Sequence, residues 1–206
     1  MLEKYLSRTR NYRFGDISLE IPPEVFHPGF FYSTQFLLRH ISTISLQCQR
    51  FLELGAGSGL ISIYAAKNGA RVTATDINPI AIEYLEKNAV HNDVNLTILH
   101  SDLFMHIPEQ VYDIIAINPP YYKKTPIHAR DFAWYCGEKG EYFESLFSDL
   151  GRYITSQSQV FMTLFEGCDF GMIANIAAKM HFKLVCIQTQ KNLLEKNFIY
   201  KIEKET

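Results

Sequence analysis

Several common signals are missing from this sequence of 206 residues. No uninterrupted apolar stretch approaches the roughly 18 residues that a transmembrane helix needs, and the N-terminus lacks the apolar centre of a secretory signal. The four cysteines form no CxxC pair, and the seven histidines have no metal-ligand spacing. We therefore expect a cytoplasmic protein with no membrane partner, no disulfide framework and no metal site.

The chain also lacks an excess of charge of either sign. Its net charge of -2 gives no general attraction to nucleic acid. Two short basic clusters nevertheless leave a local basic face open: Arg8, Arg10 and Arg13 in one, and Lys123, Lys124 and Arg130 in the other. There is no internal repeat, low-complexity tract or interdomain linker, and the length suits a single core. We expect one domain that covers residues 1–206.

From about residue 33 onward, short apolar runs alternate with segments of helical periodicity, which is typical of parallel strands joined by helices. Ser33 or Thr34 is expected to cap the first helix, whose apolar positions continue to Ile44. The expected strands are 50–54, 71–75, 97–100, 112–117 and 159–165. The expected helices lie at 59–68, from Pro79 onward, around 143–150 and at 169–180. The segments FKLVCIQT and NFIYKIE are expected to form a terminal antiparallel pair.

Two features at strand ends predict a ligand that contains a nucleoside. Gly55, Gly57 and Gly59 lie between a strand and a helix, where glycines let the backbone approach a ligand closely. A tight turn is the structural alternative for these glycines. Asp76 ends the second strand, where a carboxylate can accept hydrogen bonds from both hydroxyls of a ribose. Ligands of open parallel sheets bind at the carboxyl ends of the strands, and both features lie there.

The spacing of the glycines and the charge beside them indicate which ligand this is. GxGxG differs from the GxGxxG of dinucleotide sites, and Glu53 would repel a phosphate while suiting a cation. S-adenosylmethionine carries a sulfonium and an amino group and has no phosphate, so it fits better. Asp102 is placed to receive the adenine amino group, with Leu103 beside the ring, although Asp102 could instead cap a helix. A nucleotide-dependent oxidoreductase remains the alternative enzyme.

The segment AINPPYY, at 116–122, ends the fourth expected strand. Pro119 and Pro120 have no amide hydrogen, so they stop the strand ladder and hold the chain open. The segment could be no more than a stiff turn. The other interpretation is that Asn118 and Tyr121 are held still for a function.

The motifs ELGAGSG, TDIN, SDLF and NPPY, in this order and spacing, resemble those of the class I S-adenosylmethionine-dependent methyltransferases. The resemblance covers about residues 20–203 and is greatest to the small HemK-type branch of protein glutamine methyltransferases. It implies an α/β fold with a Rossmann-like seven-stranded methyltransferase sheet, helices on both faces and an antiparallel C-terminal strand pair. It also implies methyl transfer to a planar amide or amino nitrogen. A protein glutamine is the leading acceptor, an adenine amino group of RNA or DNA is the alternative, and a non-catalytic scaffold subunit is a further one.

The resemblance also implies roles for individual residues. By the logic of this family, the Asn118 side-chain oxygen and the Pro119 carbonyl accept the two hydrogens of the acceptor nitrogen, and Tyr121 packs against the planar group. The segment before the first strand is implied to fold over the cofactor, so residues 1–30 form a short extension near that site. The implied cofactor contacts are Phe26, Pro28, Thr34, Glu53, Gly55, Ala56, Gly57, Gly59, Asp76, Ile77, Asp102, Leu103 and Asn118, with Ser33 as a further candidate.

Other expectations concern residues around this site and the acceptor itself. His27 is expected to pack among aromatic side chains, and Trp134 and Tyr135 to serve as a lid or to contact substrate. HemK-type enzymes that modify release factors carry an N-terminal helical domain, whereas only residues 1–30 precede the cofactor fold here. The expected partner is a methyl-acceptor macromolecule, either protein or nucleic acid. A substrate-docking partner subunit could take the place of the helical domain.

Overall fold

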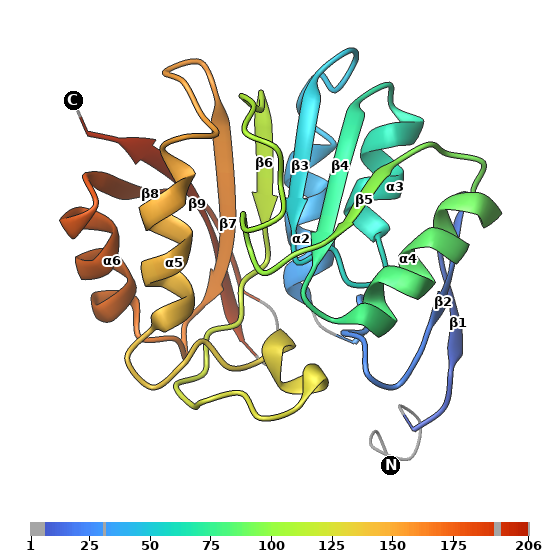
Figure 1. Ribbon diagram of the computed structural model, residues 1–206, viewed down its shortest axis with the longest axis horizontal. Helices are drawn as coiled ribbons and strands as arrows, with labels where there is room; N and C mark the ends of the chain where they lie inside the picture. The colour runs from blue at the N-terminus through green and yellow to red at the C-terminus, as the bar shows by residue number, and fades with distance from the viewer. Residues whose placement is uncertain (1–6, 31, 192–194, 206) are drawn as a thin grey trace.

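The computed structural model describes residues 7–30, 32–191 and 195–205 (Figure 1). Seven strands form one sheet in the order β5-β4-β3-β6-β7-β9-β8. The first five strands in this order run parallel, and β9 is antiparallel to both of its neighbours, β7 and β8. The predicted seven-stranded sheet with a reversed terminal pair is therefore confirmed. Residues 1–6 of the predicted N-terminal extension lie outside the described residues.

The bounds of the elements agree closely with the sequence pattern. The strands of the sheet are β3 (Arg50–Leu54), β4 (Arg71–Asp76), β5 (Thr97–His100), β6 (Ile114–Ile117), β7 (Gln159–Phe165), β8 (Phe182–Lys191) and β9 (Lys196–Lys204). The helices are α2 (Tyr32–Ile41), α3 (Leu60–Lys67), α4 (Pro79–His91), α5 (Glu141–Leu150) and α6 (Phe170–Lys179), with a short 3-10 helix, η1 (Ala129–Ala133). β6 begins later than predicted because the backbone N–H of Tyr112 bonds to Tyr153 of a loop.

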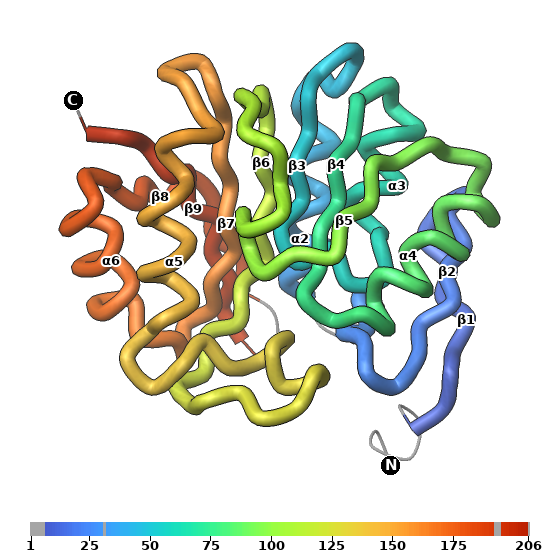
Figure 2. Tube along the Cα trace, viewed as in Figure 1, coloured from blue at the N-terminus to red at the C-terminus, as the bar shows by residue number. Residues whose placement is uncertain are grey.

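The sheet separates two hydrophobic cores. Successive residues of a strand face opposite sides, so Phe51 packs with α2, α3 and α4, while Leu52 packs with α5 and α6. The spacing of Phe143, Leu146 and Phe147 gives α5 one apolar face, and all three are buried as predicted. In Figure 2 the lower ends of β3, β4 and β6 lie on the same side of the sheet as the yellow segment that contains η1. Within the part of the chain that the structure describes, no helix is long and apolar enough to cross a membrane.

The first helix differs from the prediction at both ends. α2 begins at Tyr32, so Ser33 and Thr34 lie inside its first turn and neither is the cap. Thr34 instead accepts a hydrogen bond from the side chain of Asn118, which explains why its hydroxyl is not available to the helix. At the other end, α2 stops at Ile41 and Ile44 lies beyond it, because Ser42 and Thr43 turn the chain and bond back to carbonyls of the last turn.

A β-hairpin precedes the sheet and was not predicted. β1 (Arg10–Phe14) and β2 (Ile17–Ile21) pair with each other in a separate two-stranded sheet. β2 buries alternate residues, and its backbone bonds to the side chains of Asn88 in α4 and of Asn92, which caps the end of α4, instead of to a third strand. The hairpin is thus fixed on α4. The chain that leaves it, residues 22–30, passes over the strand ends.

Candidate active site

A cavity of about 280 Å³ opens at the carboxyl ends of the parallel strands. It is bounded by the loops after β3, β4, β5 and β6, by residues that follow the hairpin, and by the η1 loop. The predicted site residues that line it are Phe26, Pro28, Thr34, Glu53, Gly55, Ala56, Gly57, Asp76, Ile77, Asp102, Leu103, Asn118, Pro119 and Tyr121. The structure therefore brings together residues that are spread over nearly a hundred positions of sequence.

The three glycines after β3 have two different surroundings. Gly55 and Gly57 have φ of +72° and +54°, and a Cβ added to Gly55 would meet no atom within 4 Å. This open space is what a ligand against the backbone requires. Gly59 also has a positive φ, but a Cβ there would overlap the Leu85 side chain of α4, and Gly59 is not among the residues that line the cavity. Gly59 therefore allows α4 to pack closely against the loop. Ser33 is buried and does not line the cavity either.

Glu53 is a buried carboxyl group at the floor of the cavity, with 5% of its surface exposed. Its Oε2 accepts a hydrogen bond of 2.8 Å from the backbone N–H of Ser62 and another from the Ser62 hydroxyl. Burial, with a smaller contribution from the nearby Asp76, raises the pKa of Glu53 to about 8 in spite of these bonds. The group therefore favours the protonated form near neutral pH until a cation is placed beside it.

Asp76 joins the two loops that border the cavity. Its Oδ2 accepts the backbone N–H of Gly57 at 2.8 Å, and its Oδ1 accepts the backbone N–H of Asn78 at 2.8 Å. Burial raises the pKa of Asp76, while these two bonds act against that increase. Each carboxylate oxygen keeps a second lone pair that can accept a hydroxyl. Farther along the rim, Asp102 is exposed and Leu103 is buried in a left-handed conformation with φ of +45°.

Asn118 is fixed by hydrogen bonds at both ends of its side chain. Nδ2 donates to the Thr34 hydroxyl at 3.1 Å, and Oδ1 accepts from the Thr163 hydroxyl at 2.8 Å. Beside it, the Tyr121 ring packs on Phe165 with 4.5 Å between the ring centroids. Burial raises the pKa of Tyr121, so its phenol stays protonated. The segment after β6 thus presents an oriented amide next to an uncharged ring.

The loop after β6 forms the outer wall of the cavity. The backbone N–H groups of Tyr121 and Tyr122 both donate to the Trp134 carbonyl, at 3.2 and 2.9 Å. The Trp134 ring reaches Phe26 with 5.1 Å between centroids, which links this loop to the segment after the hairpin. His27 is buried and its ring contacts the rings of Tyr12 and Phe30, an environment of the packing kind that was expected.

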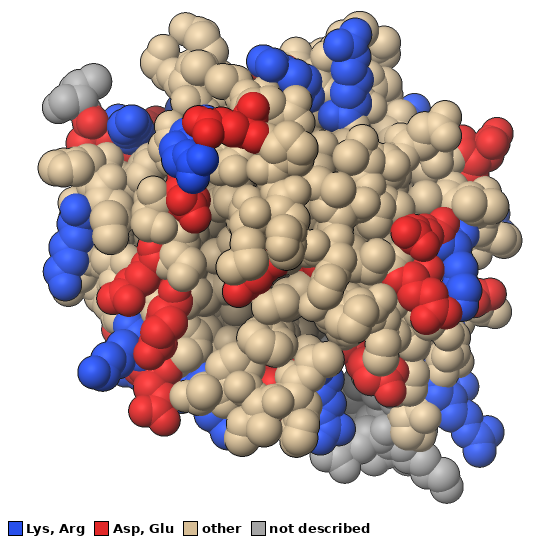
Figure 3. All heavy atoms as spheres, viewed as in Figure 1, with Lys and Arg blue, Asp and Glu red and all other residues tan. Residues whose placement is uncertain are grey.

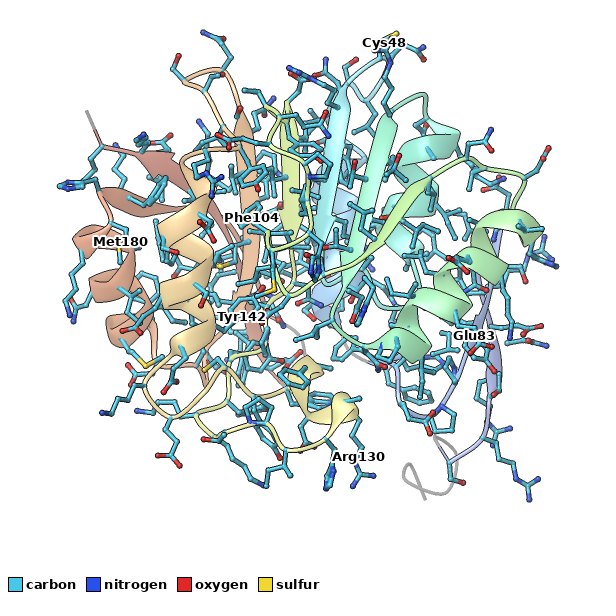
Figure 4. The ribbon with its side chains drawn as sticks, viewed as in Figure 1. Cys48, Glu83, Phe104, Arg130, Tyr142 and Met180 are labelled. Carbon is cyan, nitrogen blue, oxygen red and sulfur yellow. The ribbon has the colours of Figure 1, made fainter. Side chains whose placement is uncertain are left out.

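The three residues of the second basic cluster have separate surroundings. Lys123 pairs with Asp169 at 2.8 Å, Lys124 lies over the Tyr135 ring, and Arg130 extends from η1 away from the sheet (Figure 4). On the face shown in Figure 3, acidic and basic side chains alternate around a largely uncharged centre. Among the residues that the structure describes, no group of three His, Cys, Asp or Glu side chains could hold a metal ion.

Tyr142 also lines the cavity, although the sequence did not predict it as a site residue. It lies in the first turn of α5 and faces the space between that helix and the sheet (Figure 4). Burial raises the pKa of its phenol, and the charges of Asp102 and Asp76, which line the same cavity, raise it as well. No sequence pattern predicts that Tyr142 lines the cavity, because it directly precedes the apolar positions of an ordinary amphipathic helix.

Comparison with known proteins gives a consistent family. A model of the methyltransferase small domain family matches residues 19–133. A putative protein N5-glutamine methyltransferase of Methanocaldococcus jannaschii is 39% identical over 106 residues, which are 51% of this chain and 51% of that protein. A tRNA1(Val) (adenine(37)-N6)-methyltransferase of a Flavobacteriaceae bacterium is 29% identical over 119 residues, 56% of this chain and 50% of that protein. The chain spans about half the length of these two curated relatives.

A solved structure with the same fold belongs to a complex. It is that of the E. cuniculi Mtq2-Trm112 complex, described as responsible for methylation of the eRF1 translation termination factor. The likeness has a TM-score of 0.67 at 19% identity and covers 88% of this chain and 99% of that one. At this identity the likeness establishes the fold alone.

Proposed function

Since the chain belongs to the methyltransferase small domain family, we propose that it transfers a methyl group from S-adenosylmethionine to a planar nitrogen, with a protein glutamine side chain as the acceptor. The observation that carries the proposal is the oriented amide of Asn118 at a cavity that Glu53 and Asp76 also line. Membership of this family favours methyl transfer over the oxidoreductase alternative.

The residues of the cavity suit this cofactor. S-adenosylmethionine, when bound, supplies a methyl group made electrophilic by its positively charged sulfur. Glu53 is a buried carboxyl group that a neighbouring cation would stabilise in its charged form. Asp76 would accept the ribose hydroxyls with the lone pairs that Gly57 and Asn78 leave unused. Open space at Gly55 lets the cofactor lie against the backbone.

The acceptor would be handled by the segment after β6. An amide nitrogen is a poor nucleophile because its lone pair is delocalised into the carbonyl group. Asn118 Oδ1 and the Pro119 carbonyl would accept its two hydrogens and direct the lone pair toward the methyl group, and the Tyr121 ring would pack on the amide plane. The nitrogen would gain the methyl group as the bond from methyl to sulfur breaks, which leaves S-adenosylhomocysteine, and the nitrogen would then release one proton. Orientation of this kind is worth roughly 7 kcal/mol or more in well-aligned reactions.

A nucleic-acid adenine is the second candidate acceptor. The tRNA adenine methyltransferase among the relatives supports it, and an aryl amine presents the same two hydrogens as an amide. A partner subunit that docks the substrate also belongs to the proposal. What supports it is the likeness in fold to the Mtq2-Trm112 complex, which is described as responsible for a methylation.

Transfer of labelled methyl groups into a cell extract tests the function and the acceptor class together. The protein is incubated with labelled S-adenosylmethionine and extract, and the product is divided between protease and nuclease digestion. We expect label that protease releases and nuclease leaves in place. Release of the label by nuclease alone would indicate that the acceptor is a nucleic-acid adenine and not a protein glutamine. The absence of transferred label, in extracts with and without co-purified partners, would contradict the function.

A further inference from the structure

The side-chain amide of Asn118 is hydrogen-bonded to two threonine hydroxyls, one at its nitrogen and one at its oxygen. Thr34 belongs to the first turn of α2 and borders the cavity, whereas Thr163 lies on β7, where 1% of its surface is exposed. The register of the sheet explains the second contact. Ile117 of β6 pairs with Met162 of β7, so Asn118 and Thr163 occupy the next row, where the proline-containing segment leaves the ladder.

The surroundings of Thr163 would suit a hydrocarbon better than a hydroxyl. On β9 its partner is Ile199, and its neighbour on the same face of β7, Phe161, belongs to the hydrophobic core beneath α2. Burying a hydroxyl without a hydrogen bond costs about 1–3 kcal/mol in proteins. Among the described residues, the Thr163 hydroxyl has one hydrogen-bond partner, the oxygen of Asn118.

This burial determines which way the amide of Asn118 points. A threonine hydroxyl can donate or accept, so either orientation of the amide could satisfy Thr34, which is next to the cavity. The proton of Thr163 has no other acceptor within the described residues, and it therefore has to go to an oxygen. If the amide were reversed, its NH2 group would face Thr163 and this proton would be buried without a partner.

We propose that Thr163 is a positioning residue that acts through Asn118. By donating to Oδ1 it keeps the amide oxygen, rather than the NH2 group, available to the acceptor nitrogen. An amide oxygen has two lone pairs, and Thr163 uses one of them. The other can accept a hydrogen of the substrate. The inference rests on the proposed function for the role of Asn118, while the orientation of the amide itself can be tested in the protein without substrate.

The first test compares two substitutions of Thr163. Thr163→Val keeps the shape and removes the donor, and Thr163→Ser keeps the donor. Single-turnover methyl transfer at saturating cofactor should be about tenfold or more slower in Thr163→Val, a smaller loss than that of a group which contacts the reacting atoms. Thr163→Ser should restore most of the rate, and the affinity for S-adenosylhomocysteine should be unchanged in both. Equal rates for Thr163→Val and the wild type would overturn the proposal.

A double-mutant cycle separates positioning from a general effect on the fold. If Thr163 acts only through Asn118, Thr163→Val has no further effect on the rate in a protein that already carries Asn118→Ala. The same proportional loss in both backgrounds would contradict the proposal. Circular dichroism and thermal unfolding of each variant confirm that the compared proteins are folded.

A measurement without substrate keeps this inference distinct from the proposed function. In NMR relaxation spectra, the side-chain amide of Asn118 should be as rigid as the backbone in the wild type and in Thr163→Ser, and more mobile in Thr163→Val. If this response is found but the wild type transfers no methyl group, the proposed function fails while the role of Thr163 in orienting the amide stands. An Asn118 amide of equal rigidity in all three proteins would overturn the inference.

Discussion

The carboxylate of Asp76 accepts the backbone N–H of Gly57 at 2.8 Å, which connects the end of β4 to the glycine loop after β3. Asp76 therefore shapes the cavity as well as lining it. We expect Asp76→Ala to weaken S-adenosylhomocysteine binding by roughly tenfold to a hundredfold, because charge-assisted hydrogen bonds are worth about 1.5–3 kcal/mol. Calorimetric titration measures this change.

Asp76→Asn is the matched control for that experiment. It keeps one oxygen that can accept the N–H of Gly57 or of Asn78, and it loses the charge and the second acceptor. Its affinity should lie between those of the wild type and Asp76→Ala. If Asp76→Ala binds with wild-type affinity, Asp76 does not contribute to the cofactor site.

The pKa of Glu53 predicts that cofactor binding depends on pH. This pKa is raised to about 8 in the protein without ligand, and a cation bound beside the group lowers it, so binding releases a proton. The affinity for S-adenosylmethionine should rise from pH 6 to pH 8, by up to about tenfold per unit, and become constant above pH 8. Calorimetry in buffers of different ionisation enthalpy should record the proton release.

Glu53→Gln isolates the part of this dependence that belongs to Glu53. The amide of the variant cannot titrate, although its oxygen can still accept the two hydrogen bonds from Ser62. Any contribution from Asp76 remains in the variant. An equal pH dependence in both proteins would show that Glu53 does not change its protonation when the cofactor binds.

Asn88 connects the hairpin to the glycine loop, and its removal should affect both. Its Nδ2 donates to the carbonyls of Glu20 and Ser58, and its Oδ1 accepts the N–H of Glu20. Asn88→Ala removes the partner of the buried Ser58 carbonyl and those of the part-buried backbone groups of Glu20, and an unpaired buried group costs about 1–3 kcal/mol. We expect lower stability in urea denaturation and weaker binding of S-adenosylhomocysteine.

Asn92→Ala is the matched control, because Asn92 bonds to the hairpin through Ser18 but not to Ser58. It should lower the stability and leave cofactor affinity nearly unchanged. If both variants lose affinity equally, the hairpin as a whole supports the site, and the bond from Asn88 to Ser58 has no separate role.

Gly55 and Gly59 should respond differently to alanine. Both have positive φ, so each substitution carries backbone strain of about 1–3 kcal/mol. The new methyl group overlaps Leu85 at position 59 and enters the open cavity at position 55. We expect Gly59→Ala to lose more stability and Gly55→Ala to lose more cofactor affinity. The reverse order, measured by denaturation and calorimetry, would contradict the separation of packing from binding in this loop.

Much of this site could be predicted from the sequence because its residues lie at or just beyond the carboxyl ends of buried parallel strands. Such strands are largely apolar, so the polar residues near their ends, among them Glu53, Asp76 and Asn118, are conspicuous. The order of the strands then brings these residues to one edge of the sheet.

The parts that could not be predicted depend on contacts between distant segments. β1 was missed because RNYRF is a half-exposed strand in which three of the five residues, Arg10, Asn11 and Arg13, are polar or charged. Ser33 and Thr34 look like helix caps, but the contact with Asn118 decides the position of Thr34. The partnership of Thr163 and Asn118 requires the register between β6 and β7, which no local pattern specifies.

The most direct test of the account is the effect of Asn118→Ala on methyl transfer, measured in a single turnover with saturating labelled S-adenosylmethionine and the acceptor found in the extract. If the amide oxygen orients the acceptor nitrogen, the rate should fall by about 10² to 10³, the loss that follows removal of one preorganised polar contact. Cofactor affinity should fall much less, and Asn118→Asp, which keeps an acceptor oxygen, should retain more activity than the alanine variant. Equal rates for the wild type and a folded Asn118→Ala would contradict the account and leave NPPY as a rigid end to a strand.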